Sequence, residues 1–285
     1  MPASHPVRHA PSVLPGAHAR LAERRCDDWE VHVGNGPVVA TAIHDGHQVR
    51  ESVLRCMRLS ADERRREEDP LTGVLTTVAD SQVRVRTSRF QTDMNRPRAL
   101  AVPRRPEDTW GLDVWRTPLP ETERARCLAD YDRFYADMRA LMDGLLETWD
   151  SLLVLDIHSY NHRRDGADAP PAAADGNPEI DLGVTTLDRA RHGGVACRFA
   201  DALRATLVDG RHPDVRENVR YPTGGHFPEW LHAEYGDRLC VISLEYKKIY
   251  MDEWSAMADV AVLDDFRYGL KRAVDAVRGE FARCR

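Results

Sequence analysis

Leu152-Leu153-Val154-Leu155-Asp156-Ile157-His158-Ser159-Tyr160-Asn161 is the segment that best predicts the fold of this chain. Five of its first six residues are apolar, and an unbroken apolar run of this kind is typical of a central strand covered on both faces. The run then passes directly into polar residues. Because open α/β sheets usually carry their chemistry where the strands end, we expect a functional site around His158.

His158 has a carboxylate two residues before it and polar side chains after it, namely Asp156, Ser159 and Asn161. A strand-end histidine beside a carboxylate is a common way to hold a metal ligand in the required tautomer. The alternative is a structural histidine that caps a loop. His158 alone favours neither interpretation. The other histidines of the chain favour the metal ligand.

A second buried strand is predicted over residues 38–43, and it ends in His44-Asp45-Gly46-His47. Histidines three residues apart in a turn can converge on one metal ion, since zinc accepts neutral imidazole nitrogens as ligands. Gly46 allows the backbone to bend sharply between them. An H-x-x-H pattern alone is a weak signal, but its position after a buried strand, with His158 at the end of another, favours a metal site.

Two carboxylates, Glu68 and Asp69, stand at the exit of a charged helical segment over residues 61–69. Ser60 is a typical N-cap for this segment, and Pro70 ends it. Such a run of charges is usually a solvated helix face. Either carboxylate could nevertheless complete or support a metal site.

Arg89, Asn95 and Arg96 lie in a polar segment over residues 87–98. An arginine binds a carboxylate in bidentate fashion, which fixes both its position and its charge, and Asp93 could orient a nearby arginine. The segment is therefore a candidate anion clamp, with an ion-paired surface loop as the alternative.

The rest of the chain predicts alternating helices and strands. Apolar residues at three- and four-residue steps mark a long helix over 121–149, which leads into the strand at 152 as in an α/β fold. The other predicted elements are a helix over 51–58, strands over 83–86, 180–184 and 239–245, a helix over 186–208, and a closing amphipathic helix that includes 266–277. Residues 161–178 show no periodicity, and their position favours a lid or substrate loop.

Two further polar residues are candidates for the site. His226 lies in a polar turn over residues 221–227, where it could contact a substrate or belong to a plain loop. Glu245 ends the last buried strand, and a carboxylate buried there requires a partner. It is either part of a structural ion pair with Lys247 or Lys248, or a general base beside a metal site.

The bulk composition excludes several classes of function. A net charge of -6 over 285 residues gives no electrostatic reason for nucleic-acid binding, and no segment has the apolar length of a membrane span or the core of a signal peptide. Six scattered cysteines form no CxxC pair, which favours reduced thiols in a cytoplasmic protein. We expect a flexible arm over residues 1–20 and a single α/β hydrolase domain over 21–285; the oligomeric state is open.

Several of these segments together resemble the N-formylglutamate amidohydrolase family, within the zinc carboxypeptidase-like hydrolases. The matching elements are His44-Asp45-Gly46, Asp93-Met94-Asn95-Arg96-Pro97, His158-Ser159, Asn177-Pro178-Glu179-Ile180-Asp181-Leu182-Gly183 and Glu245. The resemblance implies a mixed central sheet flanked by helices, of the phosphorylase/hydrolase-like type. It also implies one zinc ion and hydrolysis of an amide, often a formyl amide beside a carboxylate.

The resemblance also implies roles for individual residues. His44 and His158 would be zinc ligands. The carboxypeptidase-like pattern has a glutamate three residues after the first histidine, and this chain has His47 there. A three-histidine site is therefore predicted, with Glu68 or Asp69 as the alternative third ligand.

Asn95 and Arg96 would hold the substrate carboxylate, with Arg89 and His226 as further substrate contacts, and Glu245 would be the general base. The sequence thus predicts a zinc-dependent amidohydrolase acting on a small N-formyl or other N-acyl amino acid. Iron or manganese would also suit such ligands. The alternatives are a carboxypeptidase or deacylase with the same site, and a non-catalytic metal- or small-molecule-binding protein on this scaffold.

Overall fold

In a computed structural model of the chain, residues 27–282 and residue 284 are described. The predicted arm over residues 1–20 lies outside the described residues. The strands are β1 (Trp29–His32), β2 (Val38–Ala42), β3 (Ser81–Val85), β4 (Leu152–Tyr160), β5 (Ile180–Gly183), β6 (Val215–Glu217) and β7 (Leu239–Lys247). The α-helices are α2 (Glu51–Leu54), α3 (Ala61–Glu67), α4 (Thr72–Leu75), α5 (Glu121–Leu146), α6 (Arg189–Arg204), α7 (His226–Tyr235) and α8 (Val260–Val277).

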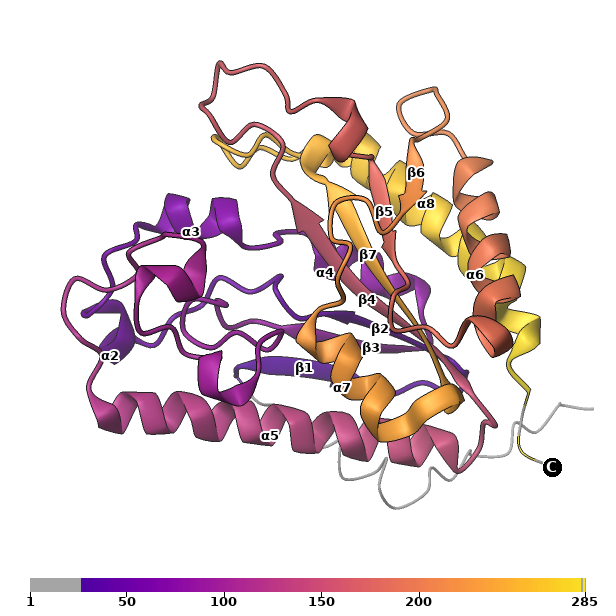
Figure 1. The fold of residues 1–285 in the computed structure, drawn as a ribbon, viewed down its shortest axis with the longest axis horizontal. Helices are drawn as coiled ribbons and strands as arrows, with labels where there is room; N and C mark the ends of the chain where they lie inside the picture. Colours follow the sequence, from indigo (N-terminus) through magenta and orange to yellow (C-terminus); the bar gives the residue numbers. More distant parts are fainter. Residues whose placement is uncertain (1–26, 283, 285) are drawn as a thin grey trace, which may run out of the picture.

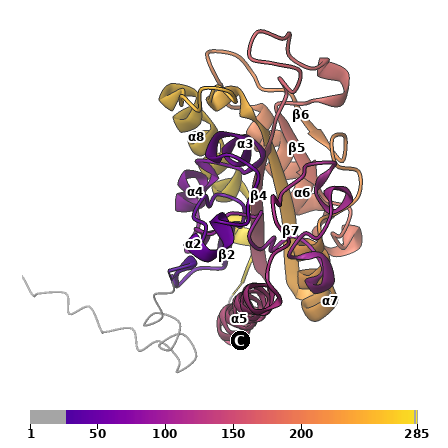
Figure 2. The same ribbon diagram turned by 90° about the vertical axis from the view of Figure 1, so that its left-hand side faces the viewer.

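The strands form one mixed sheet in the order β1-β3-β2-β4-β7-β5-β6, with β4 and β7 near its centre (Figures 1 and 2). Four of the five inner strands, β3, β2, β4 and β7, run parallel. β1 is antiparallel to β3, β5 is antiparallel to β7, and β6 is parallel to β5. The carboxyl ends of β2, β4 and β7 therefore lie at one edge of the sheet.

The two faces of the sheet are covered by different helices. β4 is buried along its whole length, and its residues alternate between two apolar clusters, as the pleat of a strand requires. Leu152 and Val154 pack in the cluster that includes α5 and α7, whereas Leu153 and Leu155 pack in the cluster that includes α4, α6 and α8. The unbroken apolar run thus corresponds to a strand with helices on both sides.

Asp156 and His158 continue the alternation of Leu152 and Val154 along β4. By the two-residue period of a strand, their side chains point to the face that carries α5 and α7. Both are buried. The side chains of Asp156 and His158 therefore lie on the same face of the sheet.

The predicted strands and the long helix are present, with small shifts at their ends. Ser60 also caps α3 as expected, since its hydroxyl accepts a hydrogen bond from the Glu63 N–H. Four of the strands and helices were not predicted: β1, the four-residue α4, the three-residue β6, and α7, which begins at His226 within the predicted polar turn. Within the described residues, no helix is long and apolar enough to cross a bilayer.

Candidate active site

Three adjacent parallel strands deliver polar side chains to the same edge of the sheet. His44 follows β2 by two residues, and His158 and Glu245 lie near the ends of β4 and β7. The register pairs His158 directly with Glu245. A fourth side chain, Asp69, enters from the segment after α3, where its backbone N–H donates to the His44 carbonyl at 2.9 Å.

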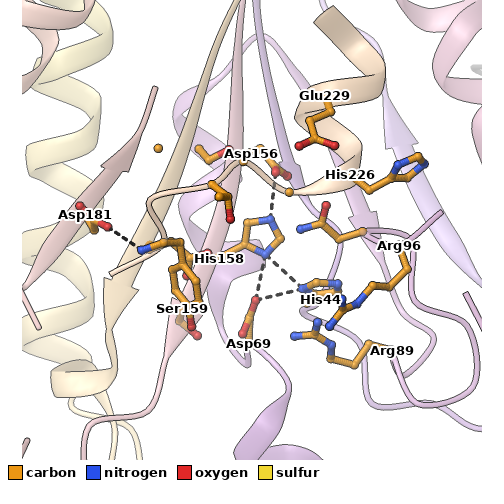
Figure 3. Close-up of a pocket in the computed structure, with 18 of the residues that line it drawn as sticks. His44, Asp69, Arg89, Arg96, Asp156, His158, Ser159, Asp181, His226 and Glu229 are labelled. Carbon is orange, nitrogen blue, oxygen red and sulfur yellow. Dashed lines mark hydrogen bonds and ion pairs between the residues drawn. The ribbon is translucent and has the colours of Figure 1, made fainter. Parts of the chain in front are cut away.

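His44, Asp69 and His158 form a compact buried group (Figure 3). Their candidate ligand atoms all lie within 4.8 Å of one another. The two Nδ1 atoms of the histidines are 3.1 Å apart. Asp69 Oδ2 lies 3.1 Å from the His158 Nδ1 and 3.4 Å from the His44 Nδ1.

The opposite nitrogens of both rings face carboxylates. His158 Nε2 lies 2.9 Å from Asp156 Oδ2, and His44 Nε2 lies 2.8 Å from Asp93 Oδ1. Because a carboxylate accepts hydrogen bonds, these contacts place the ring proton of a neutral histidine on Nε2. The two Nδ1 lone pairs and the Asp69 carboxylate then converge on one another.

Three acceptors that converge without a donor are electrostatically unfavourable unless a cation lies between them. A proton is one such cation: although burial opposes it, Asp156 and Asp69 raise the pKa of His158 well above its ordinary value. Burial likewise opposes the ionisation of Asp69, but the two histidines hold its pKa well below its usual range. Two imidazoles and a carboxylate are equally a donor set for a divalent metal ion, and each histidine already has the outer carboxylate that metal-bound histidines usually have.

His47 is outside this group, which corrects the predicted three-histidine set. Its Nδ1 lies 2.6 Å from Glu68 Oε2, and its side chain is about one third exposed. Glu68 or Asp69 was the alternative third ligand predicted from the sequence, and Asp69 is the one that lies beside His44 and His158. Glu68 is also excluded, because its two carboxylate oxygens bind His47 and the Ser88 hydroxyl.

Asp93 links the buried group to the arginine segment. Its Oδ1 accepts from His44 and from the Asn95 backbone N–H at 2.8 Å, and its Oδ2 accepts from Arg89 Nε and Nη2 at 3.2 and 2.9 Å. Burial opposes ionisation of Asp93, but Arg89 and His44 hold its pKa well below the usual range. Nη1 is therefore the one nitrogen of the Arg89 guanidinium group that does not bind Asp93.

Asn95, Arg96 and His226 lie together at one end of the site. Asn95 Oδ1 accepts from the Phe227 N–H at 2.9 Å, at the start of α7, and His226 Nε2 lies 3.1 Å from the Tyr131 hydroxyl. A Cβ on Gly225 would lie 2.6 Å from the Asn95 amide, so glycine is required there. Among the described residues, the Arg96 guanidinium has an aromatic contact with Trp110 but no carboxylate partner.

A cavity of about 420 Å³, the first cavity, joins these groups. It is lined by all the predicted site residues except His47, and also by residues that the sequence did not single out as ligand contacts, including Trp110, Asp181, Tyr221 and Glu229. Burial raises the pKa of Glu245 to about 8, with His158 opposing the shift and Asp69 adding to it. A carboxylate with a raised pKa in a cavity is a candidate proton acceptor.

The predicted ion pair of Glu245 with Lys247 or Lys248 does not form in the described part of the chain. The Lys248 ammonium instead donates to the Arg66 and Glu68 carbonyls and to Asn161 Oδ1. No residue of the predicted substrate loop, residues 161–178, lines the first cavity, but Asn161 and Arg164 line a cavity that adjoins it. Trp110 could have been suspected from its place in an aromatic loop next to the arginines. Asp181 belongs to a segment, residues 177–183, that resembles the family, but it was given no role in the site.

Comparison with solved structures places this fold beside an N-formylglutamate amidohydrolase from Ralstonia eutropha JMP134. That structure matches with a TM-score of 0.65 and 17% identity, over 89% of this chain and 100% of the other. A gene product of Agrobacterium tumefaciens matches with a TM-score of 0.55 and 17% identity, over 88% of this chain and 96% of the other. At these identities the likeness concerns the fold alone.

No curated protein matches the chain significantly. The family model described as N-formylglutamate amidohydrolase, however, matches residues 36–251, a span that contains every candidate site residue. The chain therefore belongs to the N-formylglutamate amidohydrolase family of amide-bond hydrolases.

Proposed function

We propose that this protein is a metal-dependent amidohydrolase that removes the formyl group, or another small acyl group, from an amino acid with a free carboxylate. His44, Asp69 and His158 would hold one divalent ion, of which Zn²⁺ suits two imidazoles and a carboxylate well. The substrate is a small molecule. The family membership supports amide hydrolysis, and the metal, the base and the substrate are our inferences from the site.

One observation supports this proposal above the others: three acceptor atoms converge within a buried group while Glu245, on the adjacent strand, faces the same cavity. A site that merely stabilised the fold would place donors against these acceptors. Here the neighbouring donors are directed elsewhere, since Arg89 binds Asp93 and Lys248 binds main-chain carbonyls.

When bound, the metal ion supplies Lewis-acid polarisation of the amide carbonyl and increases the acidity of a water molecule. Glu245 removes the proton from the attacking water and delivers it to the amide nitrogen as the C–N bond breaks. A pKa raised towards neutral pH by burial suits a group that both accepts and releases a proton. The products are the free acid of the acyl group and the amino acid.

The substrate carboxylate is held at the end of the first cavity where Asn95 and Arg96 lie. Arg96 has a guanidinium without a carboxylate partner among the described residues, and Asn95 is fixed beside it by the start of α7. Arg89, rigidly held by Asp93, is positioned to direct its remaining Nη1 towards an oxyanion. Such fixed donors lower the barrier because they need no reorganisation as charge develops.

The test is the metal content of protein purified without added metal, measured by mass spectrometry for the wild type, His158→Ala, Asp69→Ala and His47→Gln. We expect near-stoichiometric metal in the wild type, loss in His158→Ala, and retention in His47→Gln, which keeps a hydrogen bond to Glu68. Each protein is then assayed with N-formyl-L-glutamate and a panel of other N-acyl amino acids.

Metal loss in His47→Gln with retention in Asp69→Ala would restore the three-histidine site. Metal-free wild type that cannot be loaded with Zn²⁺, Fe²⁺ or Mn²⁺ would remove the proposed mechanism. Metal that binds as expected without hydrolysis of any N-acyl amino acid would leave a metal-binding protein on this scaffold.

A further inference from the structure

We call the group formed by His44, Asp69 and His158 the metal cluster. A second cavity, of about 410 Å³, adjoins the first next to this cluster. The two cavities share the walls formed by Asp69, Arg89, Trp110, Ser159 and Tyr221. The walls that belong to the second cavity alone include Tyr160, Asn161 and Arg164, from the end of β4 and its following loop, and Arg220. Hydrolysis of a formyl group would leave this space unused, because formyl contributes only one carbon and one oxygen.

Arg220 is the distinctive residue of the second cavity. Its guanidinium lies 5.5 Å from the ring centre of Tyr160 and 5.2 Å from that of Tyr221. Its Nε is buried and has no hydrogen-bond partner, and no carboxylate pairs with it among the described residues. Glu217, three residues before Arg220, pairs with Arg189, and the Asp181 carboxylate accepts from the backbone N–H groups of residues 219–221.

The other cations that line the second cavity already have partners. Arg164 pairs with Glu67 at 3.5 Å, and Arg89 pairs with Asp93. The Lys248 ammonium donates three hydrogen bonds. Arg220 is therefore the lining cation whose charge is unmatched, and an unpaired guanidinium on a cavity wall favours an anionic ligand.

The position of the second cavity indicates which part of a substrate it would receive. Asn95, Arg96 and His226, which would hold the amino-acid carboxylate, line the first cavity but not the second. In Figure 3, Ser159, which lines both cavities, lies on the opposite side of His158 from Arg96 and His226. A substrate anchored at Arg96, with its amide at the metal cluster, would extend its acyl group past the cluster towards Ser159 and Arg220.

We propose that the second cavity binds the acyl group of the substrate, and that this acyl group ends in a carboxylate held by Arg220. The substrate class is then a monoamide between a short dicarboxylic acid and an amino acid, such as an N-succinyl amino acid. Water adds to the amide carbonyl, the C–N bond breaks, and the products are the dicarboxylate and the amino acid. This inference rests on the proposed amidohydrolase function.

The experiment compares kcat/KM for three acyl groups on the same amino acid, L-glutamate: formyl, butanoyl and succinyl. Butanoyl and succinyl have the same number of carbons and differ by the terminal carboxylate. We expect the metal-loaded wild type to prefer succinyl over butanoyl by roughly 10- to 100-fold, the range of a charge-assisted hydrogen bond. Arg220→Met should reduce this ratio to about one, and Arg220→Lys should retain part of it.

The matched control is Arg198→Met, which removes a surface arginine paired with Glu280 on the far side of the sheet. It should keep the wild-type ratio. Equal kcat/KM for the succinyl and butanoyl substrates in the wild type would overturn the inference without any variant, so a folding defect in Arg220→Met cannot obscure the result.

A second substrate pair tests the rival position for the anion. In one contrary outcome, Arg220→Met changes the preference between N-butanoyl-L-glutamate and N-butanoyl-L-glutamine while the succinyl-to-butanoyl ratio of kcat/KM stays the same. That result would show that the second cavity binds the amino-acid side chain, and it would overturn the inference. Hydrolysis of N-formyl-L-glutamate without any succinyl preference would also overturn it, while the proposed function would stand. Failure to hydrolyse any of these amides would remove the function and the inference together.

Discussion

Two buried polar centres lie next to each other in this protein, and they are completed in opposite ways. At Lys248, an ammonium that is 1% exposed donates to three acceptors, the Arg66 and Glu68 carbonyls and Asn161 Oδ1, at 2.6–2.8 Å. At the metal cluster, His44, Asp69 and His158 are equally buried, but their inward atoms are all acceptors. The first centre is complete within the chain, whereas the second requires a cation from outside.

The difference separates a structural role from a functional one. A buried ammonium is stable only when its hydrogen bonds are made, and Lys248 makes all three that it can. The two centres are also connected, because Lys248 holds the carbonyl of Glu68, and the next residue is the candidate ligand Asp69. The complete centre thus fixes the chain segment on which the incomplete one depends.

The largest expected effect comes from Glu245→Gln, which leaves both centres intact but removes the proposed proton acceptor. We expect the variant to bind metal as the wild type does, while kcat for its N-acyl substrate falls by about 10²- to 10⁴-fold, the usual contribution of general base catalysis. Metal content and steady-state kinetics on the same preparation check this. Turnover within tenfold of the wild type would assign the base elsewhere.

Lys248→Met tests the link between the centres. Leaving a buried acceptor without a donor costs about 1–3 kcal/mol of unfolding free energy, and the three acceptors of Lys248 lose their donor together. Metal affinity should fall by roughly tenfold as the segment before Asp69 loosens. Urea unfolding of metal-free protein and competition with a chromophoric chelator give the two quantities.

The control for this variant is Lys271→Met, which removes an exposed lysine paired with Asp275 on α8. Such a surface change should alter stability by no more than about 0.5 kcal/mol and leave metal affinity unchanged. If Lys248→Met destabilises the fold but the folded fraction binds metal with unchanged affinity and an unchanged Co²⁺ absorption spectrum, Lys248 supports the fold and does not position Asp69.

The same comparison explains what could be predicted from the sequence. The buried strands β2, β4 and β7 were predictable because long apolar runs have few other interpretations, and their parallel arrangement brings His44, His158 and Glu245 together. The helix α7 was missed because its first residues, after Gly224 and Gly225, have the composition of a turn. Short elements of this kind depend on tertiary packing more than on local pattern.

The choice between His47 and Asp69 could not be made from spacing. Both residues are close in sequence to a plausible ligand position, and the outcome depends on how the segment after α3 folds back onto β2. The Asp69 N–H bonds the His44 carbonyl, and Glu68 pairs with His47. Likewise, the unpaired state of Arg220 is a property of its surroundings and has no signature in the sequence.

Asp93→Asn tests the outer carboxylates of the cluster with a smaller change. An asparagine can still accept one hydrogen bond from His44 but loses the charge that orients Arg89. Replacing such an outer partner usually reduces metal affinity by about 10- to 100-fold. Asp132→Asn, which removes an exposed partner of Arg98, is the matched control; equal affinities in the two variants would show that Asp93 acts on the arginine alone.

The stability of metal-free protein should depend on pH through Glu245. Glu245 has a folded pKa of about 8 against an ordinary value of 4.5, so between these values the folded state holds a proton that the unfolded state has released. Stability therefore falls as pH rises through this window, by at most about 1.4 kcal/mol per pH unit, and by less where solvent in the cavity reaches the carboxylate. Glu245→Gln removes this component, so the wild type should lose stability relative to the variant between pH 5 and pH 8 in chelator-treated samples. Parallel urea-unfolding free energies across that range would mean that Glu245 is already ionised without metal, and that the cluster carries a proton of its own.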